Sequence, residues 1–212
     1  FYFVPANEPW GADDDTDMEY LYQHLMLQHQ VSILTSEQIQ QGWLKHIYSE
    51  NDAPLYKKFP DSKPVKENFL WVSNERALAL MQQGLLPPAT SEPQNNDKYM
   101  MIDAQLTTEI FGFFAPARPD IALKMAELPI RTTAYEDAAW ISEYYVIMYS
   151  LASYVDQELS MKEKILWMAN ESRKRLPEDS YSSKMFDFVK HQYDSGVSWE
   201  TARDAVYQRY QV

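Results

Sequence analysis

The sequence contains no cysteine, which excludes disulfides, thiolate nucleophiles and zinc sites built on thiolates. This absence fits a cytoplasmic protein and an exported one, so the compartment stays open. Glycine is scarce, with five residues, and the sequence has no glycine-rich phosphate loop and no Gly-x-Ser-x-Gly elbow. No apolar run approaches the roughly 20 residues that cross a bilayer, so we predict no membrane-spanning segment.

Positive charge is also in short supply, with 19 Lys and Arg against 31 Asp and Glu and a net charge of −12. An acidic chain gains little from contact with polyphosphate or anionic lipid, so neither nucleic acid nor a membrane is expected as the main partner. The length of 212 residues and the apolar content of 45% are typical of a globular domain with a substantial core. We therefore predict a single domain over residues 1–212.

The spacing of apolar residues predicts an all-α fold. Met18, Leu21, Tyr22, Leu25 and Met26 recur at helical spacing, and no run long enough for a strand alternates with period two. Thr35 to Gln38 has the character of a capping box that opens a second helix, and Gly84 is a plausible helix C-terminus. Further helices are predicted at 74–83, 100–114, 119–128, 135–156, 160–175, 181–195 and 198–210. Loops are predicted at 51–68 and 86–96, and the joints between later helices are predicted at Pro116, Pro119, Pro129 and Pro177.

The segment 138–152 is apolar almost all round, which predicts a helix at the centre of the fold. Its aromatic residues are expected to belong to the core rather than to a ligand site, because aromatics dominate protein cores. Glu143 lies within this segment, and a glutamate there needs an ionic partner or a position at the edge of a cavity.

An acidic knot, residues 11–19, contains Asp13, Asp14, Asp15, Thr16 and Asp17 just before the first helical segment. Consecutive carboxylates repel one another, and a bound Mg²⁺ or Ca²⁺ removes that penalty because these ions prefer carboxylate and hydroxyl oxygens. The same residues also favour helix N-caps and first turns, where they accept amide hydrogens. Spacing alone leaves both the metal-binding and the capping interpretation open.

The knot resembles the Asp-Asp-Thr-x-Met signature of the ADP-ribosylglycohydrolase family, in the form Asp14-Asp15-Thr16-Asp17-Met18. Three further segments are similar to that family and follow in its order. They are Ile102-Asp103-Ala104-Gln105, then Phe111-Gly112 with Ala115-Pro116-Ala117-Arg118-Pro119, and then Arg131-Thr132-Thr133-Ala134-Tyr135-Glu136-Asp137-Ala138. Together these segments span most of residues 10–155.

This resemblance implies an orthogonal multi-helix bundle around a dinuclear Mg²⁺ site, and hydrolysis of the N- or O-glycosidic bond between ADP-ribose and an acceptor. By position, Asp14 and Asp15 are the expected catalytic residues, and Asp13, Asp14 and Asp15 the expected metal ligands. The resemblance places Asp103, Gln105 and Thr133 at the substrate. The expected partner is ADP-ribose or an ADP-ribosylated substrate.

The chain also departs from the pattern of that family. The late Gly-x-Asp-x-Asp-Thr/Ser segment does not occur between Leu159 and Val212, and only ten residues precede Gly11. A two-metal site needs more oxygen ligands than the knot supplies. We therefore expect this chain to be part of a longer domain, with a missing segment or a second chain completing the site. The alternative is a catalytically incomplete helical module that binds a nucleotide-sugar or a protein.

The histidines are not expected to bind metal. His24 and His29 lie five residues apart on one predicted helix, rather than the four that place two ligands on one face, and His46 and His191 stand alone. Without a partner motif, a satisfied or exposed histidine is the better interpretation for each of them.

Overall fold

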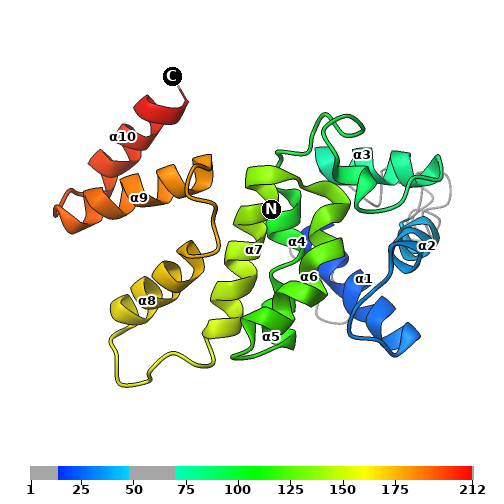
Figure 1. The fold of residues 1–212 in the computed structure, drawn as a ribbon, viewed down its shortest axis with the longest axis horizontal. Coiled ribbons are helices and arrows are strands. Elements are labelled where there is room, and N and C mark those ends of the chain that lie inside the picture. The colour runs from blue at the N-terminus through cyan, green and yellow to red at the C-terminus, as the bar shows by residue number, and fades with distance from the viewer. Residues whose placement is uncertain (1–13, 48–69, 212) are drawn as a thin grey trace, which may run out of the picture.

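The computed structural model describes residues 14–47 and 70–211, and every regular element in those ranges is a helix (Figure 1). The prediction of an all-α fold is therefore confirmed. The predicted loop at 51–68 lies outside the described residues. The elements are α1 (Asp14–His29), α2 (Ser36–His46), α3 (Val72–Gln82), η2 (Ala89–Ser91), α4 (Asp103–Thr107), α5 (Ile110–Phe114), α6 (Pro119–Thr133), α7 (Glu136–Leu151), α8 (Met161–Arg173), α9 (Tyr181–Asp194) and α10 (Trp199–Tyr210).

Helix α7 is the centre of the arrangement, as the apolar character of 138–152 predicted. It packs against α4, α5 and α6, and it also contacts α8 and α9. Helices α1, α2 and α3 lie on the far side of α4 and α6 from the C-terminal helices (Figure 1). The first seven helices thus form one body with α7 at its border toward the C-terminal segment.

The hydrophobic core gathers side chains from α1, α2, α5, α6 and α7. Tyr22 and Phe111 are almost fully buried, and their ring centroids are 5.7 Å apart. Phe111 also meets the edge of Phe114 at 5.7 Å, and Trp43 is 1% exposed. Burial raises the pKa of the Tyr22 hydroxyl, although the nearby Thr132 and Trp43 side chains lower it by a smaller amount. Tyr22 is therefore a neutral core residue that ties α1 to α6.

The expectation that the aromatics of α7 form the core is wrong. The buried residues of α7 are Ala139, Ser142, Val146, Ile147, Ser150 and Leu151, whereas Trp140 and Tyr144 are half-buried and Tyr145 and Tyr149 are exposed. Neighbouring helices come too close to α7 for large side chains, since a Cβ atom on Gly112 would lie 2.5 Å from the Val146 carbonyl oxygen. The large rings are consequently displaced to the flanks of the helix.

Several helix boundaries differ from the sequence prediction, and α7, for example, ends at Leu151 rather than at residue 156. Pro129 was expected to end a helix, but α6 continues through it to Thr133, and Pro129 is buried. A proline inside a helix costs roughly 3 kcal/mol, which the packing of α6 against α4, α5 and α7 offsets. The predicted helix at 100–114 is divided into α4 and α5 at Thr108, whose φ of −131° and ψ of −4° are not helical.

Local capping follows the sequence closely. The Thr35 hydroxyl accepts a hydrogen bond from the Gln38 amide at 3.2 Å, and the Gln38 side chain accepts one from the Thr35 amide at 2.9 Å. This is the predicted capping box at the start of α2. Gly84 has a φ of +92° just after α3 and provides the predicted helix end.

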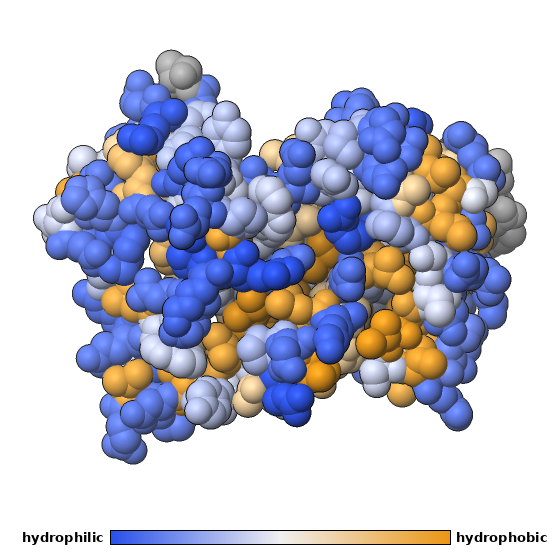
Figure 2. All heavy atoms as spheres, viewed as in Figure 1, coloured by the Kyte–Doolittle hydropathy of each residue, from blue (hydrophilic) through white to orange (hydrophobic). Residues whose placement is uncertain are grey.

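The C-terminal arm, which we define as α8, α9 and α10, contributes little to the core. The buried residues of α8 and α9 are Ser172, Ser182 and Ser183, and every residue of α10 is at least partly exposed. Apolar atoms reach the surface along this arm between hydrophilic ones, and a notch separates the arm from the side that carries α3 (Figure 2). Among the described helices, none combines the length and the apolar character needed to span a bilayer.

Candidate functional site

The acidic knot lies at the beginning of α1. Asp13 is outside the described residues, and Asp14 is the first residue of the helix, although its side chain is not described. Asp15 is half-buried, whereas Thr16 and Asp17 are exposed, and each of these three makes at least one interaction. In the described ranges, no group of three or more His, Asp or Glu side chains is arranged to hold a metal ion. The metal-binding role of Asp13, Asp14 and Asp15 therefore remains a prediction.

Asp103 has a structural role that the sequence did not indicate. Its side chain is 2% exposed, and its Oδ1 accepts a hydrogen bond from the backbone amide of Asn74 at 3.1 Å. Asn74 lies in the first turn of α3, whose N-cap residue is Trp71, and an indole has no oxygen to accept an amide hydrogen. Asp103, the first residue of α4, thus caps α3 from another helix.

Further polar groups are buried around this contact. Within the described part of the chain, the Asn74 Nδ2 and the Ser73 hydroxyl are buried without a hydrogen-bond partner. Thr107 and Thr108 donate to the carbonyls of Asp103 and Ala104 at 2.9 and 2.6 Å. Buried polar groups without partners are uncommon, and an ordered water, an ion or a ligand can supply the missing partner. Sequence reasoning missed Ser73 and Asn74, because two polar residues in a first helical turn normally face solvent.

The other two predicted substrate residues lie on helices that adjoin α4. Gln105 is half-buried on α4, and Thr133 is the 2% exposed last residue of α6. The neighbouring Thr132 carbonyl accepts a hydrogen bond from Thr90 at 2.7 Å, which fixes this end of α6 to η2. Helix α4 packs against both α1 and α6. The structure thus places the helices that carry the knot, Asp103 and Thr133 next to one another.

The capping role of Asp103 can be tested by substitution. Asp103→Ala should lower the free energy of unfolding by about 2 kcal/mol, because it leaves the buried Asn74 amide without an acceptor. Asp103→Asn retains an acceptor oxygen and should cost clearly less. Urea unfolding of both variants measures the difference. Equal losses for the two substitutions would contradict the capping role.

A polar cavity of about 530 Å³ opens between α6 and α7. Its walls combine charged, apolar and aromatic side chains: Pro88, Leu123, Lys124, Glu127, Leu128, Arg131, Trp140, Glu143 and Arg175. Glu143 is paired with Arg175, with 2.6 Å between Oε2 and Nε. The prediction was that Glu143 has a partner or lies at the edge of a cavity, and the structure shows both.

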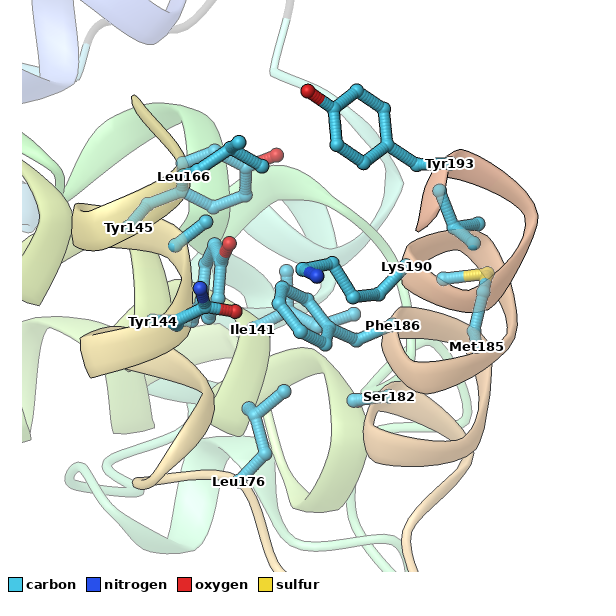
Figure 3. Close-up of a pocket in the computed structure, with 13 residues that line it drawn as sticks. Ile141, Tyr144, Tyr145, Leu166, Leu176, Ser182, Met185, Phe186, Lys190 and Tyr193 are labelled. Atoms are coloured by element: carbon cyan, nitrogen blue, oxygen red, sulfur yellow. The ribbon is translucent and has the colours of Figure 1, made fainter. Parts of the chain in front are cut away.

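An apolar cavity of about 400 Å³ lies between α7, α8 and α9 (Figure 3). Tyr144, Phe186 and Leu166 point toward one another across it from three different helices (Figure 3). The Tyr144 and Phe186 ring centroids are 6.0 Å apart. Burial raises the pKa of Tyr144 to about 12, with a contribution from Tyr145. The cavity is therefore a largely apolar space where the arm meets the body, with a neutral Tyr144 and with Lys190 in its wall.

Two histidines that are distant in sequence lie side by side. The rings of His24 on α1 and His46 on α2 meet edge to face with centroids 5.0 Å apart. The Nε2 of His46 is buried and makes no hydrogen bond to any described residue. Burial, and to a smaller extent the charges of His24 and Lys45, lower the pKa of His46. Among the described residues, no third His, Asp or Glu joins this pair to form a group that could hold a metal ion.

The His46 environment predicts a dependence of stability on pH. As the pH falls through about 6.5, the unfolded chain binds a proton on His46 before the folded chain does, so stability decreases. His46→Phe should reduce this decrease, which thermal melting between about pH 7.5 and pH 5 measures. His191→Phe, at an exposed position on α9, should leave the slope unchanged. A slope that is the same in His46→Phe and the parent would contradict the prediction.

No protein-family model, curated protein or solved structure matches this chain.

Proposed function

We propose that this protein is a Mg²⁺-dependent hydrolase of the ADP-ribosylglycohydrolase type, which cleaves the glycosidic bond between ADP-ribose and an acceptor. The proposal rests on the ordered motifs of residues 10–155 and on one structural observation. This observation is the buried contact between Asp103 and Asn74, which joins α4 to α3, and α4 also packs against α1, the helix that begins at Asp14.

The residues of the knot fit a hard cation in their chemistry. Asp13, Asp14 and Asp15 supply carboxylate oxygens, which Mg²⁺ prefers, and Asp14 and Asp15 are the first two residues of α1. When bound, Mg²⁺ would orient the ribose hydroxyls and a water molecule and would neutralise the clustered carboxylates. The three carboxylates are fewer ligands than two ions require, so a further segment or chain completes the site in this proposal.

The residues around Asp103 would bind the substrate. The Asn74 side-chain Nδ2 and the Ser73 hydroxyl, which have no partner among the described residues, are donors that a ribose or an ordered water can satisfy. Asp103 holds the start of α3 in place through the Asn74 amide and so fixes both groups. Gln105 lies on α4, and Thr133 is the last residue of α6, which packs against α4. Both side chains would add contacts to the substrate. In this proposal, negative charge from the knot stabilises the oxocarbenium-like transition state.

Calorimetric titration with Mg²⁺, in the presence and absence of ADP-ribose, tests the proposal without requiring turnover. We expect ADP-ribose to strengthen Mg²⁺ binding, because the metal and the ribose share one site. A release assay on an ADP-ribosylated protein then measures the hydrolysis. If neither titration gives heat with this chain, the experiment is repeated with the longest natural form of the protein. The absence of binding heat in that experiment would overturn the proposal.

A second candidate is a catalytically incomplete helical module that binds a partner protein or a nucleotide-sugar. The C-terminal arm favours this alternative, because Met161, Tyr181 and Trp199 are each about 70% exposed on helices that bury only serines. The module would bind ADP-ribose or a protein with no response to Mg²⁺. Metal-independent binding together with an absence of hydrolysis by the longest natural form would favour the module.

A further inference from the structure

The polar cavity between α6 and α7 carries a local excess of positive charge in an acidic protein. Lys124, Arg131 and Arg175 face Glu127 and Glu143 in its walls. The cavity is therefore net positive by one charge, whereas the whole chain carries −12. The negative net charge of the protein repels anions. A concave site that gathers cations is therefore the place where an anion can bind.

Two of these cations are not neutralised by any carboxylate of the described residues. Glu143 is engaged by Arg175 at 2.6 Å. Glu127 precedes Arg131 by four residues, a spacing that favours an ion pair. The residues that the structure describes nevertheless show no ion pair from Glu127, Lys124 or Arg131. Lys124 and Arg131 therefore remain available to a ligand.

The guanidinium group of Arg131 is held in place, but one of its hydrogen-bond donors has no acceptor among the described residues. Its guanidinium carbon lies 4.3 Å from the centre of the Tyr135 ring, which fixes the orientation of the group. Its Nε is buried and has no acceptor among the described residues. Leaving a buried charged donor unpaired is costly, and a ligand oxygen would remove that cost.

The remaining walls indicate the kind of anion. Trp140 supplies a half-buried aromatic ring, and Leu123, Leu128 and Pro88 supply apolar surface beside the cations. A volume of about 530 Å³ is that of a small-molecule site rather than of a single ion. Arginine binds phosphate through several donors, and indole rings stack on planar bases.

We infer that this cavity binds a nucleotide, with its phosphates on Lys124 and Arg131 and its base on the apolar wall that includes Trp140. The inference does not depend on the proposed hydrolase activity. None of these residues belongs to the acidic knot or to the buried polar groups around Asp103. The site would bind a nucleotide in the absence of Mg²⁺.

Titration with ADP in the presence of EDTA tests the site, with adenosine and inorganic diphosphate as comparison probes. ADP should bind more tightly than either part alone, and added salt should weaken its binding. Arg131→Gln and Lys124→Gln should each weaken ADP binding about tenfold, because each removes a charge-assisted contact. Glu127→Gln should strengthen binding, since it removes a repelling carboxylate.

The controls separate this site from the knot. Asp14→Asn and Arg118→Gln should bind ADP as the parent does, because Arg118 is an exposed cation outside the cavity that pairs with Asp120. Circular dichroism checks that Arg131→Gln is folded, and Lys124 is exposed, so its substitution leaves the fold intact. Absence of ADP binding, equal binding of adenosine or of diphosphate, or binding lost in Asp14→Asn but retained in Arg131→Gln would each overturn the inference.

Discussion

Gly112→Ala should lower the free energy of unfolding by at least about 2 kcal/mol, because the added methyl group has no room. An alanine Cβ would lie 2.5 Å from the Val146 carbonyl oxygen, 2.6 Å from the Tyr149 Cβ and 2.8 Å from the Ser150 amide nitrogen. These are atoms of the α7 backbone or directly attached to it, so a side-chain rotation cannot relieve the overlap. Helices α5 and α7 would have to separate, which exposes the neighbouring Phe111.

Gly42→Ala is the matched control, since Gly42 is also a buried helical glycine. Its Cβ would meet the terminal carbons of Leu25, which belong to a flexible side chain. Both substitutions gain about 1 kcal/mol of helix propensity, so the difference between them reports packing alone. Urea unfolding measures both variants, and a loss for Gly112→Ala no larger than that for Gly42→Ala would show that α5 and α7 are not packed this closely.

Asp14→Asn should abolish the response to Mg²⁺ if the knot is a metal site. Replacing a carboxylate ligand by an amide removes a full negative charge at nearly constant volume. Even substitutions of residues behind the ligands usually cost about 10–100-fold in metal affinity, so we expect a loss of at least about 100-fold for a direct ligand. The helical content should not change, because the loss of one interaction with the helix dipole, about 0.3–1 kcal/mol, is too small to unfold α1.

Asp120→Asn is the control for the effect of charge at a helix start. Asp120 occupies the first turn of α6, is exposed and belongs to no predicted metal site. Both substitutions remove one favourable interaction with a helix dipole, worth about 0.3–1 kcal/mol, and Asp120→Asn also removes the exposed ion pair with Arg118. If Asp14→Asn lowers the melting temperature as Asp120→Asn does and leaves Mg²⁺ binding intact, the knot is a helix cap and the hydrolase proposal loses its metal site.

The candidate site was only partly readable from the sequence. The motifs singled out Asp103, which is buried on α4, the helix that packs against α1. They did not show that its carboxylate caps α3, because its partner Asn74 is 29 residues away. The cavity between α6 and α7 was also missed, apart from Glu143. Its cations come from α6 and from Arg175, and Arg175 is 32 residues from Glu143 in the chain.

The sequence by itself determined the helical class, the capping box at Thr35 and the helix end at Gly84. These features depend on the periodicity of neighbouring residues and on hydrogen bonds within one turn, so they are encoded locally. Only the tertiary structure decided that α6 continues through Pro129, that the rings of α7 lie at its flanks and that Asp103 caps α3. Each of these depends on how closely helices distant in sequence approach one another, and packing of the whole chain sets that distance.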